Sequence, residues 1–330
     1  MKLIHQILLI IITLLLVVIV YLAWLVWMPL KSEQAVFHIK SGDSASTIAN
    51  TLSSQGIIRS RNMFVMLARL RHSQNKLKAG TYSFGGNYNL IQTLKMVEKG
   101  NTTAISITIP PGFNLHQTLQ RMERSGMASY DSLLVRANDP ELIYKLTGKE
   151  LPSLEGYLFP DTYHFDLGSS IQTLLSIPVQ NFFRQMHRAG IEPDSIPDFD
   201  QKLILASIVE KESAHPDERP IIAGVYWNRM QKGMRLESCP TVNYLLLQEG
   251  IKREVLTNKD LSIQSPYNTY LNAGLPPTPI SNPSLQAIQA AISPQKHNYL
   301  FFVSNRKGRN DFSATYQEHL QKKRKYEKSD

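Results

Sequence analysis

An uncharged apolar run over residues 7–27 constrains what this chain can fold into more than any other feature of its sequence. Its length of about 20 residues matches the roughly 30 Å hydrocarbon core of a bilayer. A cleavable signal peptide is the alternative, but its apolar region would be shorter and would end in small residues. This run ends in Tyr21, Trp24 and Trp27 instead, which resemble an interfacial aromatic belt. We therefore expect a transmembrane helix over residues 7–28, after a short tail of residues 1–6.

The rest of the chain contains no second apolar run of spanning length, so it would lie on one side of the membrane as a tethered body. Charges that flank the run do not orient it, because Lys2 and the amino terminus on one side face Lys31 and Lys40 on the other. The sequence thus predicts a single-pass membrane protein, and its charges alone leave the topology open.

Composition and motif content exclude several classes of function. With 330 residues, the chain can form two or three domains with ordinary cores. Its net charge of +9 would suit an acidic partner such as anionic lipid or nucleic acid, but a solvated basic surface is the commoner origin of such a charge. The 9 histidines and the lone Cys239 show no metal-ligand spacing, and neither a glycine-rich phosphate loop nor a G-x-S-x-G elbow occurs. We expect no cofactor, no metal and no nucleic-acid partner.

The segment after the apolar run has the pattern of a small α+β module over residues 36–101. A strand at 36–40, helices at 45–54 and 64–71, and a return strand at 81–84 fit its hydrophobic periodicity. Glycine turns separate these elements.

A second small α+β segment, which we treat as a connector, follows over residues 102–150. Ile39-Lys-Ser-Gly42 aligns with Ile109-Pro-Pro-Gly112, and Gly56 then falls on Gly126 at the same offset. Both stretches have the pattern strand, glycine turn, helix, glycine, which chance explains as well as duplication does. From residue 151 to 330, apolar helices alternate with loops rich in Pro, Asn, Ser and Thr. We assign the functional site to this mixed α+β domain, and the chain to the α+β class.

The best candidate for chemistry is Glu212, near the end of a helix predicted over residues 201–213. At about 100° per residue, Glu212 shares one helix face with Leu205, Ile208 and Val209. A carboxylate on an apolar stripe is costly to ionise, so its pKa should rise toward the range that suits a general acid near neutral pH.

An alternative leaves Glu212 in solvent at a fraying helix end, or in an ion pair with Arg219 or Arg229. Glu210 lies on the opposite face beside Lys211 and is the weaker candidate for catalysis. Periodicity alone does not establish a catalytic Glu212 over a solvent-exposed or ion-paired Glu212.

A second helix is expected after the first, with Asp217 and Glu218 as its capping residues and Gly233 as its stop. The loop at residues 234–241 and the run at 265–270 then supply amides, hydroxyls and aromatic faces, which suit a polar sugar polymer. Loops of this composition are more often simple connectors, and their tyrosines are often core residues.

Several motifs follow one another in a fixed order along the chain. They are Leu154-Glu-Gly-Tyr-Leu-Phe-Pro-Asp-Thr-Tyr163, Ala206-Ser-Ile-Val-Glu-Lys-Glu-Ser213, Asn228-Arg229, Gly233-Met-Arg-Leu236, Pro240-Thr-Val242, Tyr267-Asn-Thr-Tyr270 and Gly274-Leu-Pro-Pro277. Together they resemble the endolytic murein transglycosylases of the MltG (YceG-like) family. The resemblance extends to the amino-terminal span and to the module at residues 36–101, which looks like the LysM-like domain of that family.

The resemblance implies an enzyme that cleaves nascent peptidoglycan between N-acetylmuramic acid and N-acetylglucosamine and leaves a 1,6-anhydromuramoyl end. The second Glu of the family's E-K-E-[ST] motif falls on Glu212, which would act first as acid and then as base while the muramoyl 6-hydroxyl attacks C1. The pair Glu212-Ser213 also resembles one found in other lytic transglycosylases. The candidates for holding the sugars are Ser213, Tyr226, Asn228, Thr241, Tyr267 and Asn268.

The resemblance also implies a location in the inner (cell) membrane, with the bulk of the chain on the periplasmic side. Its partners there would be glycan strands and cell-wall synthases such as penicillin-binding proteins. Two other interpretations stay open, a noncatalytic wall-binding scaffold and a hydrolase in which Asp161 or Glu237 is a second carboxylate. The chain departs from the family pattern at Glu237-Ser-Cys239, where Gln-[ST]-Asp is common, and at Asn310, where a His is common.

Overall fold

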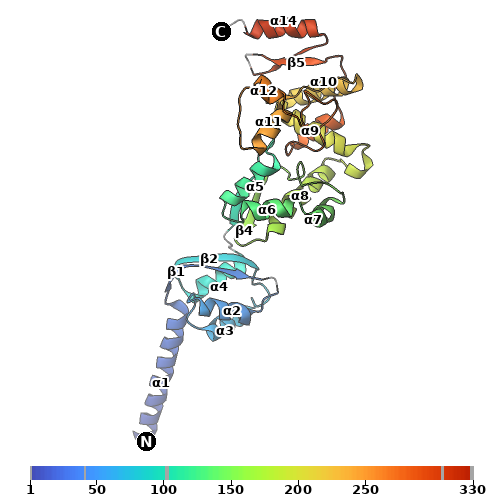
Figure 1. Cartoon of the computed structure of the whole chain (residues 1–330). Coiled ribbons are helices and arrows are strands. Elements are labelled where there is room, and N and C mark those ends of the chain that lie inside the picture. Colours follow the sequence, from blue (N-terminus) through green and yellow to red (C-terminus); the bar gives the residue numbers. More distant parts are fainter. Residues whose placement is uncertain (1, 41, 101–103, 306–307, 328–330) are drawn as a thin grey trace. The chain divides into compact units, whose positions relative to one another are not determined.

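The computed structural model describes residues 2–40, 42–100, 104–305 and 308–327, and it confirms a mixed α+β fold. The chain divides into two compact units (Figure 1). One comprises Met1–Ser106 with His164–Ser169, and the other comprises Ile107–Tyr163 with Ser170–Asp330. Most residues of the predicted connector thus pack in the same unit as the predicted catalytic domain.

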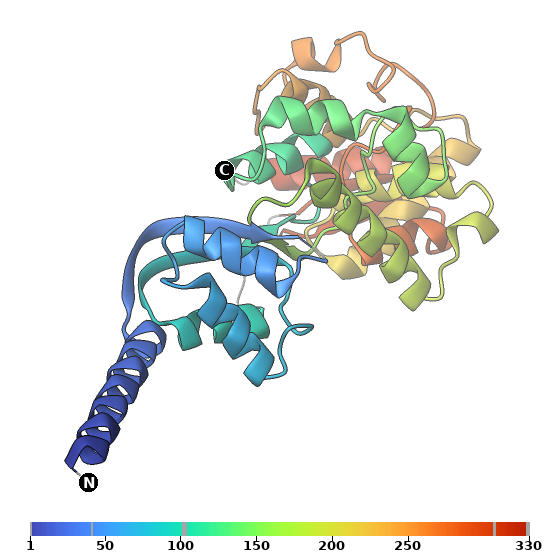
Figure 2. The same cartoon turned by 90° about the horizontal axis from the view of Figure 1, so that it is seen from below.

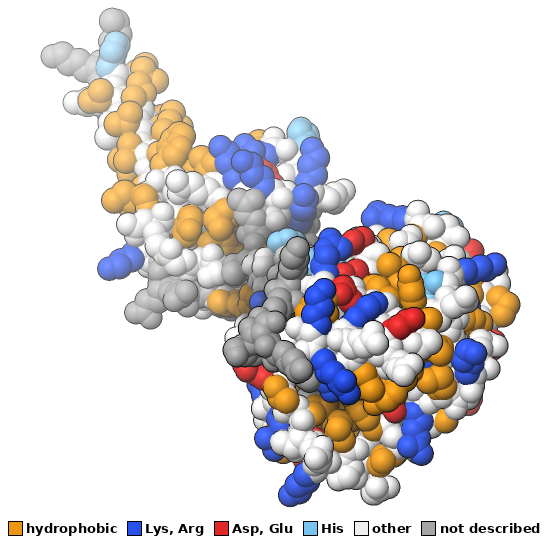
Figure 3. Space-filling view, turned by 90° about the horizontal axis from the view of Figure 1, so that it is seen from above, with side chains coloured by type: hydrophobic (Ala, Val, Ile, Leu, Met, Phe, Trp, Pro, Cys, Tyr) orange, Lys and Arg blue, Asp and Glu red, His pale blue; other side chains and the backbone are white. Residues whose placement is uncertain are grey.

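The amino-terminal apolar run forms one continuous helix, α1 (Lys2–Trp27). Hydrophobic side chains follow its length in Figure 3. By length and composition, the stretch Ile4–Trp27 is the one helix among the described residues that could cross a membrane, and no residue of its most apolar stretch is buried. Val26, near its end, packs against the core of the first unit. The predicted span therefore lies in a helix that begins a turn or more earlier than expected.

The first unit is built on a two-stranded antiparallel sheet of β1 (Leu30–Ile39) and β2 (Gly80–Tyr88). One face of this sheet is covered by α2 (Ala45–Ser54), α3 (Arg61–Leu70) and α4 (Leu90–Lys99) (Figures 1 and 2). The strand predicted at 36–40 overlaps the end of β1 and runs one residue past it, the strand predicted at 81–84 lies inside β2, and the first predicted helix coincides with α2. The second begins three residues earlier than predicted, at Arg61, because Ser60 caps it by accepting from the backbone N–H of Met63.

The boundary between the units runs through a second small sheet, formed by β3 (Ala104–Thr108) and β4 (Thr162–Asp166). The internal echo in the sequence is present in the structure, since β3 is followed by a glycine turn and a helix as β1 is. The four glycines at matching places all have positive φ, with values of 92° at Gly42, 68° at Gly56, 77° at Gly112 and 77° at Gly126.

In the second unit, four helices form a group at one end, namely α5 (Leu115–Arg124), α6 (Tyr130–Ala137), α7 (Pro140–Thr147) and α8 (Ile171–Arg188). A single turn, η1 (Pro193–Ser195), leads from α8 to the central helix α9 (Phe199–Glu212). Around α9 pack α10 (Arg219–Gln231), α11 (Cys239–Gln248) and α13 (Leu285–Ile292). The short turns η2 (Pro216–Glu218) and α12 (Asn258–Leu261) connect these helices.

Helix α9 is apolar on every side rather than along one stripe. All residues from 203 to 209 are buried, because helices surround it. The predicted apolar face at Leu205, Ile208 and Val209 is buried, but burial does not distinguish it from the opposite face, since the Glu210 side chain there is only 5% exposed.

A hairpin of β5 (Phe301–Ser304) and β6 (Asn310–Ser313) lies against α10, and α14 (Tyr316–Glu327) packs on the hairpin. Figure 1 shows this layer at the carboxyl-terminal end of the unit. The aromatic ring of Phe302 meets that of Tyr226 edge-on, with centroids 5.9 Å apart. The hairpin thus supports α10 directly beside the end of α9.

Candidate active site

Glu212 is the last residue of α9, and its carboxyl group is held by two hydroxyl groups from other elements. The hydroxyl of Tyr226 on α10 donates to Oε1 at 2.7 Å, and Ser238 Oγ donates to the same oxygen at 2.7 Å. Within the described residues, Oε2 accepts no hydrogen bond, and it is not sealed inside the protein. One oxygen is therefore fixed by the protein while the other is available to a ligand.

Burial raises the pKa of Glu212 above its ordinary value. Glu212 as a whole residue is partly exposed at the helix end, but protein atoms packed around its carboxyl group make the charged form costly. The bonds from Ser238 and Tyr226, and the charge of Arg229, lower the pKa and offset part of this effect. The alternative ion pairs expected for Glu212 do not form, because Arg219 pairs with Glu210 and Arg229 with Glu237.

Tyr226 is 2% exposed, and burial together with the nearby Glu212 charge raises the pKa of its hydroxyl well above the usual value. The hydroxyl therefore stays protonated near neutral pH and can donate a hydrogen bond to Glu212. Ser238, which the sequence reasoning missed, is 1% exposed and begins the turn into α11 without capping it. Its hydroxyl points to Glu212 instead of the helix backbone. The signal for Ser238 in the sequence is that it matches the [ST] of the family's Gln-[ST]-Asp pattern, between two residues that depart from it.

The two predicted polar loops do meet beside Glu212. Glu237 donates its backbone N–H to the carbonyl of Thr269 at 3.1 Å, and the N–H of Ser238 donates to Thr269 Oγ1 at 3.0 Å. Thr241 and Asn268 are fully buried at this junction. Thr241 Oγ1 lies 2.9 Å from Thr269 Oγ1, and Asn268 Nδ2 donates to two backbone carbonyls at 3.0 and 2.9 Å. Their side chains hold the loop that positions Ser238.

Ser213, Asn228 and Tyr267 lie around the same region and are hydrogen-bonded within the protein. Ser213 donates to the carbonyl two residues ahead at 2.6 Å and closes the turn after α9. Asn228 donates to two carbonyls of the segment 297–299, at 2.8 and 3.0 Å. The hydroxyl of Tyr267 is 2.8 Å from Thr278 Oγ1. Asn228 and Tyr267 are partly exposed, whereas Ser213 is buried.

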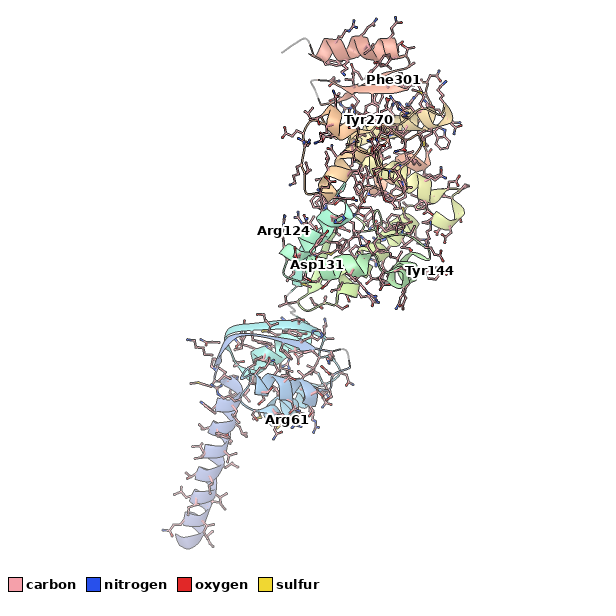
Figure 4. All side chains as sticks on the ribbon, viewed as in Figure 1. Arg61, Arg124, Asp131, Tyr144, Tyr270 and Phe301 are labelled. Carbon is pink, nitrogen blue, oxygen red and sulfur yellow. The ribbon has the colours of Figure 1, made fainter. Side chains whose placement is uncertain are left out.

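Tyr270 also faces the site, although it was not among the predicted residues. Its hydroxyl is 3.0 Å from the sulfur of Cys239, and Figure 4 shows it in the same part of the unit as Phe301. Burial raises the pKa of Tyr270, and the carboxylates of Glu212 and Glu237 raise it further. The Tyr270 hydroxyl is thus close to the negative charge of the site.

Glu210, two residues before Glu212, has a structural role. Its carboxylate forms a 2.8 Å ion pair with Arg219 and accepts from both the backbone N–H and the hydroxyl of Ser284, at 2.9 and 2.6 Å. These bonds tie α9 to the starts of α10 and α13. The Glu210 carboxylate is therefore fully engaged with the protein.

A further buried carboxyl, Glu155, was also missed. It is 3% exposed, accepts from the backbone N–H of Leu115 at 2.9 Å and from the hydroxyl of Tyr244 at 3.3 Å, and burial raises its pKa to about 8. Its position among the apolar residues of the motif from Leu154 to Tyr163 was the available signal. It joins the start of α5 to α11.

Comparisons with known proteins identify the family to which the chain belongs. The profile of the YceG-like family matches residues 37–325. The chain belongs to the YceG-like family. An endolytic murein transglycosylase of Bacillus subtilis is 31% identical over 307 residues, which cover 88% of this chain and 84% of the relative. One from Streptococcus pneumoniae is 29% identical over 296 residues, and the match spans 81% of this chain but only 53% of that longer protein. The crystal structure of a YceG-like protein from Listeria monocytogenes aligns with 31% identity and a TM-score of 0.57, over 88% of this chain and 98% of the other.

The positions at which this YceG-like chain departs from the expected pattern all have partners. Glu237 has a left-handed backbone with φ of 49°, and its half-exposed side chain pairs with Arg229 at 3.2 Å. Asn310 donates through Nδ2 to the buried carboxylate of Glu218 at 2.8 Å. Glu218 occupies the N-cap position of α10 as predicted, but neither its carboxylate nor that of Asp217 bonds to the helix end. Asp217 binds Arg309 at 2.7 Å, so both acids fasten the β5–β6 hairpin to the YceG-like core.

Proposed function

We propose that this YceG-like chain is a membrane-anchored endolytic lytic transglycosylase. It cleaves the bond between N-acetylmuramic acid and N-acetylglucosamine in nascent peptidoglycan and produces 1,6-anhydromuramoyl ends. The observation that carries the proposal is the Glu212 carboxyl group, whose pKa is raised by burial and whose Oε1 is fixed by Tyr226 and Ser238. The names of the relatives in Bacillus subtilis and Streptococcus pneumoniae support the same substrate.

In the first step, the protonated carboxyl group of Glu212 donates its proton to the glycosidic oxygen. The bond from C1 of the muramoyl residue to that oxygen breaks, and the leaving N-acetylglucosamine carries the proton away as its 4-hydroxyl. The two hydroxyl donors to Oε1 stabilise the carboxylate that remains, because charge-assisted hydrogen bonds are stronger than neutral ones.

In the second step, the 6-hydroxyl of the same muramoyl residue attacks C1 and gives its proton to the Glu212 carboxylate. A C1–O6 bond replaces the broken bond, the acid is restored, and no water is consumed. One carboxyl group therefore serves both steps, whereas an ordinary glycosidase needs a second one. The attacking group belongs to the bound sugar, so the reaction also gains from proximity. Glu237, the nearby second acid, pairs with Arg229.

The six residues predicted to hold the sugars fall into two groups in this proposal. Asn228 and Tyr267 are partly exposed and would contact the glycan directly. Tyr226, Thr241, Asn268 and Ser213 are buried, and they would act by positioning Glu212, Ser238 and the surrounding loops.

The amino-terminal unit would anchor the enzyme and orient its substrate. Helix α1 would span the inner membrane, with the following residues on the periplasmic side where glycan strands and their synthases are found. The LysM-like role proposed for residues 36–101 is supported by a groove of about 580 Å³ that is mostly polar in its lining. Asp43, Ser44, Arg69, Gln74 and Asn75 line it, and such groups can bind sugar hydroxyls.

The decisive experiment compares the intact chain with its Glu212→Gln variant on purified, uncrosslinked glycan strands, with mass spectrometry of the products. Gln keeps the shape of the side chain but cannot transfer a proton. The yield of anhydro ends should fall by about 10³-fold or more, in the upper part of the range for general acid–base catalysis, because Glu212 transfers a proton in both steps. Glycan binding should persist.

Glu254→Gln is the matched control, since Glu254 is exposed and has no ion-pair partner among the described residues. It should leave the yield unchanged. Reducing ends in place of anhydro ends would indicate a hydrolase, and the absence of any cleavage would favour a wall-binding scaffold. Full anhydro yield from Glu212→Gln would refute the proposed role of Glu212.

A further inference from the structure

A basic groove lies in the second unit, along helix α5 and outside the residues that hold Glu212. It has a volume of about 280 Å³. One wall is a stripe of α5 and the residues just before it, with Phe113, Gln117, Gln120, Arg121 and Arg124 in the lining. These positions recur at intervals of three and four residues, so they share one helix face. The segment 247–252, at the end of α11, forms the other wall.

The groove is positively charged and has no acid in its lining. Arg121, Arg124 and Lys252 are exposed, and no carboxylate of the described residues forms an ion pair with any of them. The Arg121 guanidinium lies 6.0 Å from the Phe113 ring centroid, which orients it along the groove. Figure 4 shows Arg124 at the outer edge of α5. The amides of Gln117 and Gln120 add neutral donors and acceptors between the charges.

The groove is structurally connected to the proposed catalytic centre at both walls. Phe113 follows Gly112, whose carbonyl accepts from the Nζ of Lys211, the residue before Glu212, at 3.3 Å. The opposite wall ends α11, the helix that begins directly after Ser238. The buried Glu155 carboxyl joins the two walls through Leu115 and Tyr244. The α5 wall of the groove therefore starts beside the end of α9, and the other wall lies at the far end of the helix that follows Ser238.

The geometry points to a subsite for an acidic peptide, and we propose that it binds the peptide side chains carried by the glycan substrate. This inference rests on the proposed function and specifies its substrate as peptide-bearing rather than bare glycan. Peptidoglycan peptides carry several carboxylates, and guanidinium groups bind carboxylates through paired hydrogen bonds. Arg121 and Arg124 are separated by roughly 5 Å along the helix axis, at 1.5 Å per residue, and Lys252 lies on the facing wall. A five-residue peptide reaches about 17 Å when extended, so its acidic groups can meet all three cations.

The test uses the full chain in detergent and two forms of the same glycan strands, one with peptides and one from which an amidase has removed them. The triple variant Arg121→Gln, Arg124→Gln, Lys252→Gln removes the three charges without touching the site of Glu212. Each exposed ion pair contributes roughly 1.5- to 5-fold to binding, so the three together should lower kcat/KM on peptide-bearing glycan on the order of tenfold. On peptide-free glycan, kcat/KM should be unchanged. On peptide-bearing glycan, the difference in kcat/KM between the intact chain and the triple variant should shrink at high salt.

A matched control removes three other exposed charges of the same unit, with Arg188→Gln, Lys145→Gln and Lys259→Gln. It should leave kcat/KM unchanged on both glycans. The variant Arg124→Lys keeps the charge but loses the paired hydrogen bonds, so its preference for peptide-bearing glycan should lie between those of the intact chain and the triple variant. Thermal unfolding of every variant shows whether a loss of activity reflects a loss of fold.

The outcomes separate this inference from the proposed function. Suppose the unaltered chain makes anhydro ends from both glycans. If kcat/KM of the triple variant then falls equally on both glycans, or on neither, the peptide subsite is wrong and the enzyme assignment stands. Competition by inorganic phosphate, without competition by a free acidic peptide, would show a phosphate site and would also overturn the inference. If the unaltered chain makes no anhydro ends from either glycan, the proposed function itself fails.

Discussion

Removal of the Tyr226 hydroxyl should shift the pH dependence of the enzyme. The variant Tyr226→Phe keeps the ring that packs on Phe302 but deletes the 2.7 Å bond to Glu212 Oε1. That bond stabilises the carboxylate form more than the acid form, so its loss raises the pKa of Glu212 further. Since the first step needs the protonated acid, activity falls as the pH rises through that pKa. The alkaline limb of the pH–rate profile should therefore move to higher pH.

The size of the effect follows from the kind of bond that is removed. A hydrogen bond to a charged group contributes about 1.5–3 kcal/mol. A difference of 1.4 kcal/mol corresponds to about tenfold in an equilibrium, so the balance between acid and carboxylate should change by about tenfold to a hundredfold. The maximal rate should fall by a smaller factor than this balance changes, since Ser238 still donates to Oε1.

The assay is kcat/KM for anhydro-end formation, measured across pH with the intact chain and with Tyr226→Phe. Ser238→Ala is the matched variant, because it deletes the other 2.7 Å bond to the same oxygen and should move the limb in the same direction. Glu212→Gln should show no such limb. An alkaline limb that stays in place in both variants, or moves to lower pH, would refute the assignment of Glu212 as the titrating acid.

Two further predictions concern the buried carboxyls outside the site. Glu210→Gln should lower the free energy of unfolding by about 3 kcal/mol, because it leaves the buried Arg219 guanidinium without its counter-charge. Calorimetry of the intact chain and the variant measures this difference, and an unchanged unfolding temperature would contradict the prediction. Burial raises the pKa of Glu155 to about 8 in the folded protein, whereas the same group has a pKa of about 4.3 in the unfolded chain. The contribution of Glu155 to the free energy of unfolding therefore falls as the pH rises between those two values. Glu155→Gln should flatten that dependence in thermal unfolding at pH 5 and pH 8, and an equal slope in both proteins would show that Glu155 does not titrate.

Local patterns predicted many of the elements well, because short-range rules govern them. The start of α2, the end of α10 and the repeated glycine turns follow from capping residues and from the positive φ that glycine tolerates. The helix that carries Glu212 followed from its periodicity and from the proline after it. Helix α4 was not predicted, although Asn89 and Gln92 form a capping box at its start that the sequence contains.

Contacts between residues far apart in the chain could not be predicted in the same way. Periodicity gave the direction of Glu210 and Glu212 on an isolated helix, but not the helices that surround α9 on all sides. The partner of Glu210 is a guanidinium nine residues on, and the partners of Glu212 come from α10 and from a loop 26 residues away. Ser238 was missed because nothing local distinguishes a serine that donates to a distant carboxyl from a serine that caps a helix.

Different environments at one helix end give the two carboxyls of the E-K-E motif different uses. Glu210 faces a guanidinium and a helix start, so its charge is neutralised and its oxygens are all engaged in joining α9 to α10 and α13. Glu212 faces two neutral hydroxyl groups, which stabilise a carboxylate without supplying a full positive charge. A full ion pair would lower the pKa of the carboxyl group and keep it ionised, whereas complete burial without donors would raise the pKa and keep the proton bound. Only the intermediate environment of Glu212 lets one carboxyl group give a proton in one step and take it back in the next.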